Sequence, residues 1–149
     1  MKDKILLVGG GHYVAVNPWF IVHPGGDDDK IIITAREVNT YKTEWTIEKI
    51  KNEALKFEAE HGKKTKVACM GLAFKPNIDD LIESPALYIA QKLANELENV
   101  VCVEPNINNS QLVSIEDAME ADIITFLVGH DEFKGLDIKT NLDFCGVLN

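Results

Sequence analysis

The early part of the chain carries hydrophobic residues at helical spacing in two neighbouring stretches. The first runs from Lys30 to Asn39 and the second from Thr43 to about His61. We therefore predict two helices, and Gly62 is a natural residue to end the second one. The apolar stripe of this second helix comprises Trp45, Ile47, Ile50, Ala54 and Phe57.

After Gly62, short apolar runs alternate with helical patterns. Strands are expected over residues 65–70, 100–103, 123–128 and 142–144, and a short helix over residues 114–121. Ser84 is a good N-cap, and Pro85 suits the first position of a helix. The helix after Pro85 is expected to bury Ala86, Ile89, Ala90, Leu93, Ala94 and Leu97.

This alternation predicts an α/β fold with a parallel sheet. A helical N-terminal segment, residues 1–62, would be followed by a Rossmann-like domain, residues 63–149. Lys4 to Gly11 resembles the opening of a dinucleotide-binding fold, a strand running into glycines, but Pro18 blocks the helix that must follow. We interpret that similarity as accidental.

Composition narrows the possible partners. The 149 residues carry a formal net charge of −9, with a pI of about 4.8, which disfavours nucleic acid and anionic membranes. A local phosphate site is still possible, since one lysine and a helix N-terminus suffice for it. The sequence has no apolar run long enough to cross a membrane, and its three cysteines form no C-x-x-C pair, so we expect a cytoplasmic protein.

The segment from Gly71 to Ala86 is the strongest candidate for a binding site. It reads as a buried strand, a loop and a well-capped helix, and loops at the carboxyl edge of parallel strands are where α/β sheets bind ligands. Lys75 can meet a phosphate as a point charge. A solvated turn explains the spacing equally well. Turn chemistry alone accounts for Val103–Asn106, and His130 is most simply a satisfied histidine at a strand end.

Several segments together resemble the UDP-glucose/GDP-mannose dehydrogenase family, closest to its UDP-N-acetyl-D-mannosamine dehydrogenase branch. They are G-G-H-Y-V-A-V-N-P-W-F from Gly10, A-R-E-V-N from Ala35, G-L-A-F-K-P-N-I-D-D-L-I-E-S-P-A from Gly71, V-E-P-N from Val103, L-V-G-H-D-E-F-K from Leu127 and D-F-C-G from Asp143. The resemblance runs from Gly10 to the end of the chain. It implies a remnant of the family's central helical and dimerisation domain over residues 1–62, and its nucleotide-sugar (UDP) domain over residues 63–149.

The resemblance also implies which residues keep a role. Substrate binding would fall to Gly10, Gly11, His12, Phe74 and Lys75. No catalytic residue is expected, because Tyr13 stands where the family has its catalytic Cys and Asn17 where it has an Asp. No cofactor-binding residue is expected, because Ile82 stands where the family has an Arg that faces the cofactor. Cys145 stands where the family has a basic residue.

The resemblance therefore implies the nucleotide-sugar-binding and dimerisation part of a UDP-sugar 6-dehydrogenase, inactive alone. The family uses NAD, but this chain should bind none by itself and should bind UDP or a UDP-sugar weakly. The apolar stripe from Trp45 to Phe57 would be exposed in a monomer, so we expect a homodimer through the N-terminal helices. Two alternatives are an oxidoreductase subunit completed by a separate NAD-domain chain and a folded remnant without a ligand.

Overall fold

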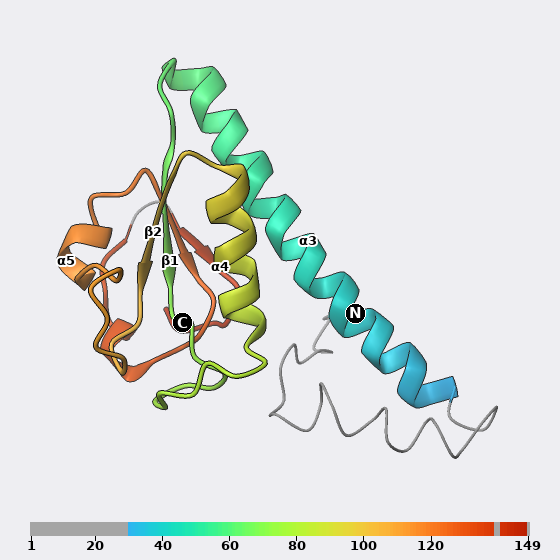
Figure 1. Cartoon of the computed structure of the whole chain (residues 1–149). Coiled ribbons are helices and arrows are strands. Elements are labelled where there is room, and N and C mark those ends of the chain that lie inside the picture. Colours follow the sequence, from blue (N-terminus) through green and yellow to red (C-terminus); the bar gives the residue numbers. More distant parts are fainter. Residues whose placement is uncertain (1–29, 139–140, 149) are drawn as a thin grey trace.

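A four-stranded parallel sheet forms the centre of the protein, which is described here by a computed structural model covering residues 30–138 and 141–148. Strand β1 (Lys66–Met70) lies between β2 (Asn99–Val103) and β3 (Ile123–Phe126), and β4 (Asn141–Asp143) pairs with the far side of β3. A long helix precedes the sheet, and shorter helices connect its strands (Figure 1). The predicted Rossmann-like α/β fold is confirmed.

Helix α3 (Lys30–His61) is one continuous helix, so the prediction of two helices is wrong. The stretch between the two expected helices contains no Gly or Pro that would break a helix. Its threonines stay helical: the Oγ1 of Thr43 donates to the Asn39 carbonyl at 3.1 Å, and that of Thr46 to the Lys42 carbonyl at 2.9 Å. The helix ends at Gly62, as predicted, with a φ of 64°.

The remaining elements lie close to where the sequence places them. Helix α4 (Pro85–Glu96) begins as expected, since the Ser84 hydroxyl accepts a hydrogen bond from the Leu87 amide at 3.3 Å. Helix α5 (Ile115–Ala118) is shorter than predicted, β3 ends at Phe126, and a 3-10 helix, η2 (Asp131–Phe133), follows it. Ala94 is exposed, not buried as predicted, because it lies beyond the edge of the face that α4 turns to the sheet.

Two hydrophobic clusters cover the two faces of the sheet. On one face, α3 and α4 pack against Val67 and Cys69 of β1. On the other face, Ala118 of α5 and Phe133 of η2 pack against alternate residues of the same strands. Strand β1 is therefore apolar along most of its length, as a strand buried on both faces must be.

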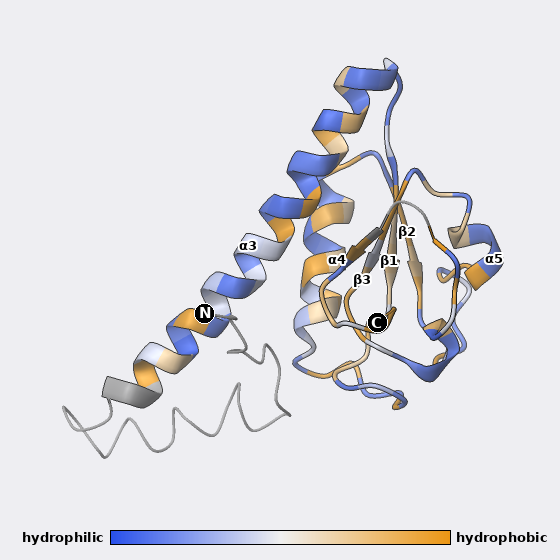
Figure 2. Ribbon diagram, turned by 180° about the vertical axis from the view of Figure 1, so that it is seen from behind, coloured by the Kyte–Doolittle hydropathy of each residue, from blue (hydrophilic) through white to orange (hydrophobic). Residues whose placement is uncertain are grey.

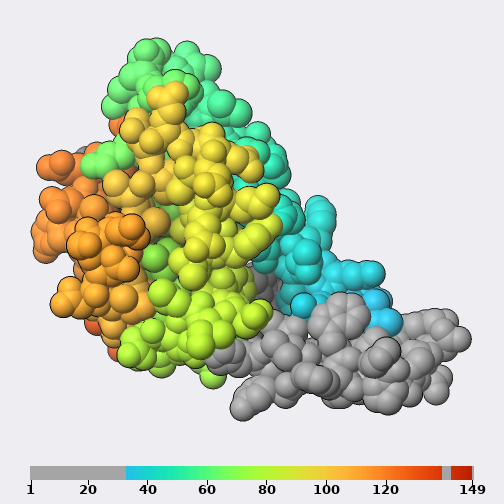
Figure 3. Space-filling model, viewed as in Figure 1, coloured from blue at the N-terminus to red at the C-terminus, as the bar shows by residue number. Residues whose placement is uncertain are grey.

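The apolar stripe of α3 is covered by the chain's own sheet domain. Ile47, Ile50 and Ala54 are 2%, 0% and 0% exposed and share a cluster with α4 and β1. Figure 2 shows hydrophobic residues of α3 where it meets α4, and Figure 3 shows the first part of α3 extending beyond the body of the domain. The expectation that this stripe would be exposed in a monomer is therefore wrong for Ile47, Ile50 and Ala54, because the sheet and α4 bury them.

No helix among the described residues is both long enough and apolar enough to cross a membrane. This follows for α3 from its composition, since lysine and glutamate recur along its 32 residues.

Gly71, which follows β1, offers a test of how tightly the sheet edge is packed. Its φ is 89°, and a Cβ at this position would lie 2.7 Å from both the Cβ and the carbonyl oxygen of Val128. We expect Gly71→Ala to lower the free energy of unfolding by at least about 3 kcal/mol, measured by urea denaturation. Gly62→Ala is the control: its φ is 64° but nothing lies within 4 Å, so a loss of about 1 kcal/mol is expected. Equal losses would contradict the steric argument.

Candidate functional site

The loops that follow the four parallel strands meet at the carboxyl edge of the sheet. The loop after β1 carries Phe74 and Lys75, the one after β2 carries Glu104, the one after β3 carries His130, and the one after β4 carries Cys145. This is the edge at which open α/β sheets bind ligands. The sequence motifs that are far apart along the chain therefore converge in space.

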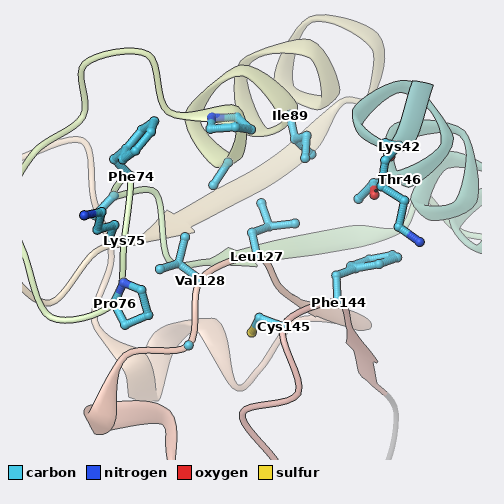
Figure 4. A pocket seen from close by; sticks show the side chains of 14 residues that line it. Lys42, Thr46, Phe74, Lys75, Pro76, Ile89, Leu127, Val128, Phe144 and Cys145 are labelled. Atoms are coloured by element: carbon cyan, nitrogen blue, oxygen red, sulfur yellow. Dashed lines mark hydrogen bonds between the residues drawn. The ribbon is translucent and has the colours of Figure 1, made fainter. Parts of the chain in front are cut away.

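A cavity of about 390 Å³ opens at this edge, between the sheet and α3 (Figure 4). Its walls come from Lys42 and Thr46 of α3, from residues 73–76 after β1, from the start of α4, from residues 127–129 after β3, and from Phe144 and Cys145 after β4. Phe74 and Lys75 thus lie where the sequence analysis expected a binding site. Lys42 and Thr46 were not expected there.

The charges around the cavity have one sign. Of the residues that line it, Lys42 and Lys75 carry positive charge, and none is an aspartate or glutamate. The chain as a whole has a formal net charge of −9, so this arrangement departs from the average of the sequence. A cavity lined by two ammonium groups attracts anions.

Cys145 adds a neutral group to the cavity. Burial, together with the charge of Asp143 and the hydrogen bond to it, raises the pKa of the Cys145 thiol to about 12. A thiol with this pKa stays protonated at neutral pH and is a poor nucleophile. Cys145 therefore supplies neither a positive charge nor an activated thiolate.

Asp143 shapes the turn that places Cys145. Its Oδ1 accepts hydrogen bonds from the amides of Cys145 at 3.1 Å and Gly146 at 2.7 Å, and its Oδ2 accepts one from Leu148 at 3.0 Å. Burial raises the pKa of the Asp143 carboxyl, but these amide donors outweigh it and the net shift is downward. The Asp of the D-F-C-G segment is thus a structural residue of the loop.

Glu104 is a buried carboxylate that holds the loop after β1. Its Oε2 accepts hydrogen bonds from the amides of Leu72 at 2.8 Å and Ala73 at 2.9 Å, and its Oε1 accepts one from the Asn106 amide at 3.1 Å. The residue is 3% exposed. Burial raises the pKa of Glu104, but His130 and the three amides outweigh it and lower the pKa to about 2.

His130 completes this network from the loop after β3. Its Nδ1 accepts a hydrogen bond from the Asn77 amide at 2.9 Å, so the ring proton lies on Nε2, which donates to Glu104 Oε2 at 2.8 Å. The Oδ1 of Asn77 accepts in turn from the Asp131 amide at 2.9 Å. These bonds hold Asn77 at a φ of 61°, a left-handed conformation that asparagine tolerates.

His130 is a hydrogen-bonded histidine after a strand, as predicted. The role of Glu104 in joining two loops was not predicted. Turn chemistry does not explain why V-E-P-N carries an acid, because that acid is buried and bonded to another loop. The available signal was a glutamate directly after an apolar strand, a position where a charge needs several partners.

Of the other positions that the sequence singled out, the structure describes Ile82 but not those between Gly10 and Asn17. Ile82 is 67% exposed and does not line the cavity. Gly10, Gly11 and His12, together with Tyr13 and Asn17, lie outside the described residues. Within residues 30–138 and 141–148, no three His, Cys, Asp or Glu side chains gather as a metal site would require.

Replacing Glu104 by Gln should remove the centre of the loop network. The lowered pKa means that Glu104 stabilises the fold fully above pH 4.5, and that this contribution disappears as the pH falls towards 2. We expect Glu104→Gln to cost about 3 kcal/mol of unfolding free energy at pH 7, with the difference from the unmodified protein narrowing between pH 4.5 and 2. Urea denaturation across this pH range would measure it.

The exposed Glu132 provides the matched control. Glu132→Gln makes the same chemical change on the surface and should cost less than about 0.5 kcal/mol. A loss for Glu104→Gln that stays constant down to pH 2 would contradict the assignment of this carboxylate as the charged centre of the network.

Comparison with known proteins identifies the family of this fold and site. The model of the UDP binding domain of the UDP-glucose/GDP-mannose dehydrogenase family matches residues 68–145. The chain is 44% identical to a UDP-N-acetyl-D-mannosamine dehydrogenase from Campylobacter jejuni, over 91% of this chain and 35% of the relative. It is 42% identical to an NDP-N-acetyl-D-galactosaminuronic acid dehydrogenase from Ralstonia nicotianae, over 86% and 31%.

Solved structures agree on the fold. A UDP-D-ManNAc dehydrogenase from Pyrococcus horikoshii superposes with a TM-score of 0.81 at 24% identity, covering 99% of this chain and 38% of that one. The UDP-N-acetyl-mannosamine dehydrogenase Cap5O from Staphylococcus aureus gives a TM-score of 0.67 at 26% identity, over 80% and 31%. The chain spans about a third of the length of the relatives it matches. This chain belongs to the UDP-glucose/GDP-mannose dehydrogenase family and contains its UDP binding domain.

Proposed function

We propose that the cavity at the sheet edge binds UDP or a UDP-sugar, and that the chain is the nucleotide-sugar-binding part of a UDP-N-acetylmannosamine-like 6-dehydrogenase. The observation that carries the proposal is Lys75 in a cavity that no carboxylate lines, in a chain of net charge −9. The family's UDP binding domain covers this edge of the sheet. A ligand with several phosphate charges suits such a cavity.

Within this proposal the loop after β1 makes the main contacts. Lys75 is exposed at the mouth of the cavity, where its ammonium can meet phosphate oxygens. Phe74 is 6% exposed and forms part of the apolar wall. Gly10, Gly11 and His12 would complete the sugar side of the site, as the family resemblance implies. The division into residues 1–62, related to the central helical domain, and residues 63–149 belongs to the same proposal.

The described residues bind and orient a nucleotide sugar but do not oxidise it. NAD accepts the hydride in the family, and its contact would fall partly on position 82. The side chain of Ile82 is apolar and 67% exposed, so it offers no charge and no hydrogen bond to a cofactor. Tyr13 and Asn17 in place of the family's Cys and Asp remove the thiolate and the carboxylate. We therefore propose that the chain alone is catalytically inactive.

The free thiols support a proposal about the compartment. Cys69, Cys102 and Cys145 form no disulfide, although Cys69 and Cys102 are opposite each other on β1 and β2. Reduced cysteines suit a reducing environment. We propose that the chain works in the cytoplasm.

Lys75→Ala should weaken UDP binding by about tenfold to a hundredfold, because it removes a charge-assisted hydrogen bond to phosphate. Binding by the unmodified chain should itself be weak, with a dissociation constant on the order of 1 mM. A chemical-shift titration by NMR measures affinities in this range and also locates the ligand.

Lys64→Ala is the control, because Lys64 is exposed just before β1, at the opposite edge of the sheet. This change should leave UDP binding unaltered. UDP shifts that spread away from residues 71–80, or equal affinities for UDP and uridine, would contradict the proposed phosphate site.

We also propose that the chain self-associates through the N-terminal half of α3. Val38, Tyr41 and Trp45 are spaced by three and four residues on one side of the helix and are 36%, 69% and 41% exposed. Val38 and Tyr41 lie ahead of the part of α3 that packs on the sheet, and Trp45 stays partly exposed at its border although its ring meets Phe144. Exposed aromatic residues in a row are typical of protein interfaces.

Tyr41→Glu should convert a homodimer into a monomer, because it places a charge in the middle of this row. Light scattering at several protein concentrations would measure the mass. Leu55→Glu is the matched control, since Leu55 is 56% exposed but lies on the half of α3 that packs on the sheet domain. A monomeric unmodified chain, or a dimer that only Leu55→Glu dissociates, would contradict this interface.

A further inference from the structure

We infer that Lys42 of α3 is a second phosphate-binding residue of the cavity, acting from the wall opposite Lys75. The inference rests on the proposed function, because it assigns one more residue to the same ligand, a nucleoside diphosphate. Neither the family motifs nor the sequence pattern points to this lysine. The inference comes from its place in the cavity wall and from the lack of a carboxylate paired with it among the described residues.

Lys42 has no carboxylate beside it on the helix. The residues three and four positions away are Val38, Asn39, Trp45 and Thr46, none of them acidic. Two other lysines of α3 are paired: Lys49 lies 3.6 Å from Glu53, and Lys51 lies 3.0 Å from Glu48 and 2.6 Å from Glu96. No ion pair to Lys42 is found within the described part of the chain.

An aromatic contact holds the Lys42 ammonium at the cavity. Its Nζ lies 4.4 Å from the centre of the Trp45 ring, a cation–π contact. Trp45 in turn meets Phe144 edge to face, with ring centres 6.1 Å apart. Phe144 lines the cavity next to Cys145, so this contact ties the charge of α3 to the loop after β4. Lys42 as a residue is half-buried, and its ammonium lies beside the Trp45 ring in the protein without a ligand.

The cavity therefore presents positive charge on two sides. Figure 4 shows Lys42 and Phe144 on one side, with Phe74 and Lys75 on the other, and Leu127 and Val128 between them. The neutral thiol of Cys145 adds no charge near Phe144. Because both lysines line the cavity, binding should depend on how many negative charges the ligand carries. UDP should bind more tightly than UMP, and UMP more tightly than uridine.

The decisive experiment measures the affinities of UDP, UMP and uridine for the whole chain and for single variants. Lys42→Ala should weaken UDP binding by about tenfold, the usual effect of losing one charge-assisted contact, and leave uridine binding unchanged. Lys42→Arg keeps the charge and should stay within about threefold of the unmodified chain. Lys49→Ala, on the same helix but paired with Glu53, should change neither affinity.

Two readouts separate a contact from a structural role. In a Trp19→Phe background, where Trp45 is the remaining tryptophan, its emission should change when phosphate binds the ammonium beside the ring, and Lys42→Ala should abolish that change while the melting temperature stays the same. If Lys42→Ala leaves UDP affinity intact while Lys75→Ala lowers it, the proposed function stands and this inference fails. Equal losses for UDP and uridine would also overturn it. If the unmodified chain binds no UDP, the proposed function itself fails.

Discussion

The candidate site depends on one buried carboxylate. Glu104 takes two amides of the loop after β1 and one amide of its own loop, and His130 ties it to the loop after β3. A buried charge is tolerated only when hydrogen bonds satisfy it. A movement of any of these loops would therefore leave Glu104 without part of its hydrogen bonds, so the loops share one arrangement. The Phe74 and Lys75 side chains stand on a backbone that Glu104 holds at Leu72 and Ala73, and His130 holds at Asn77. The geometry of the cavity is thus set by residues that do not line it.

The distribution of charge explains how an acidic chain can keep an anion site. Several lysines outside the cavity are neutralised locally, as Lys51 is by Glu48 and Glu96, and Lys63 is by Asp122 at 2.6 Å. The buried Glu104 faces the amides and His130 behind the loop and does not line the cavity. Net charge therefore describes long-range steering, which here opposes an anionic ligand, while the two cavity lysines decide the local potential.

Local signals in the sequence predicted the elements around the site and part of the site itself. Ser84, Pro85 and Gly62 act within one turn of their own position, and strands buried on both faces read as apolar runs, so caps and strands were predictable. The continuity of α3 was missed because the threonines at 43 and 46 satisfy their hydroxyls within the helix, which only the backbone geometry reveals. The role of Glu104 and the position of Lys42 depend on partners 26 to 32 residues away or on another element. No periodicity carries that information.

Helix α3 also shows why the division of the chain at Gly62 is hard to judge from sequence. Its second half contributes Ile47, Ile50 and Ala54 to the same cluster as α4 and β1, so in packing terms it belongs with the sheet. Its first half carries Val38 and Tyr41, which lie outside that cluster and are exposed. Lys42 and Trp45 lie between the two halves, where the helix passes the cavity. Because α3 is one continuous helix, its exposed first half and its buried second half meet at the wall of the cavity.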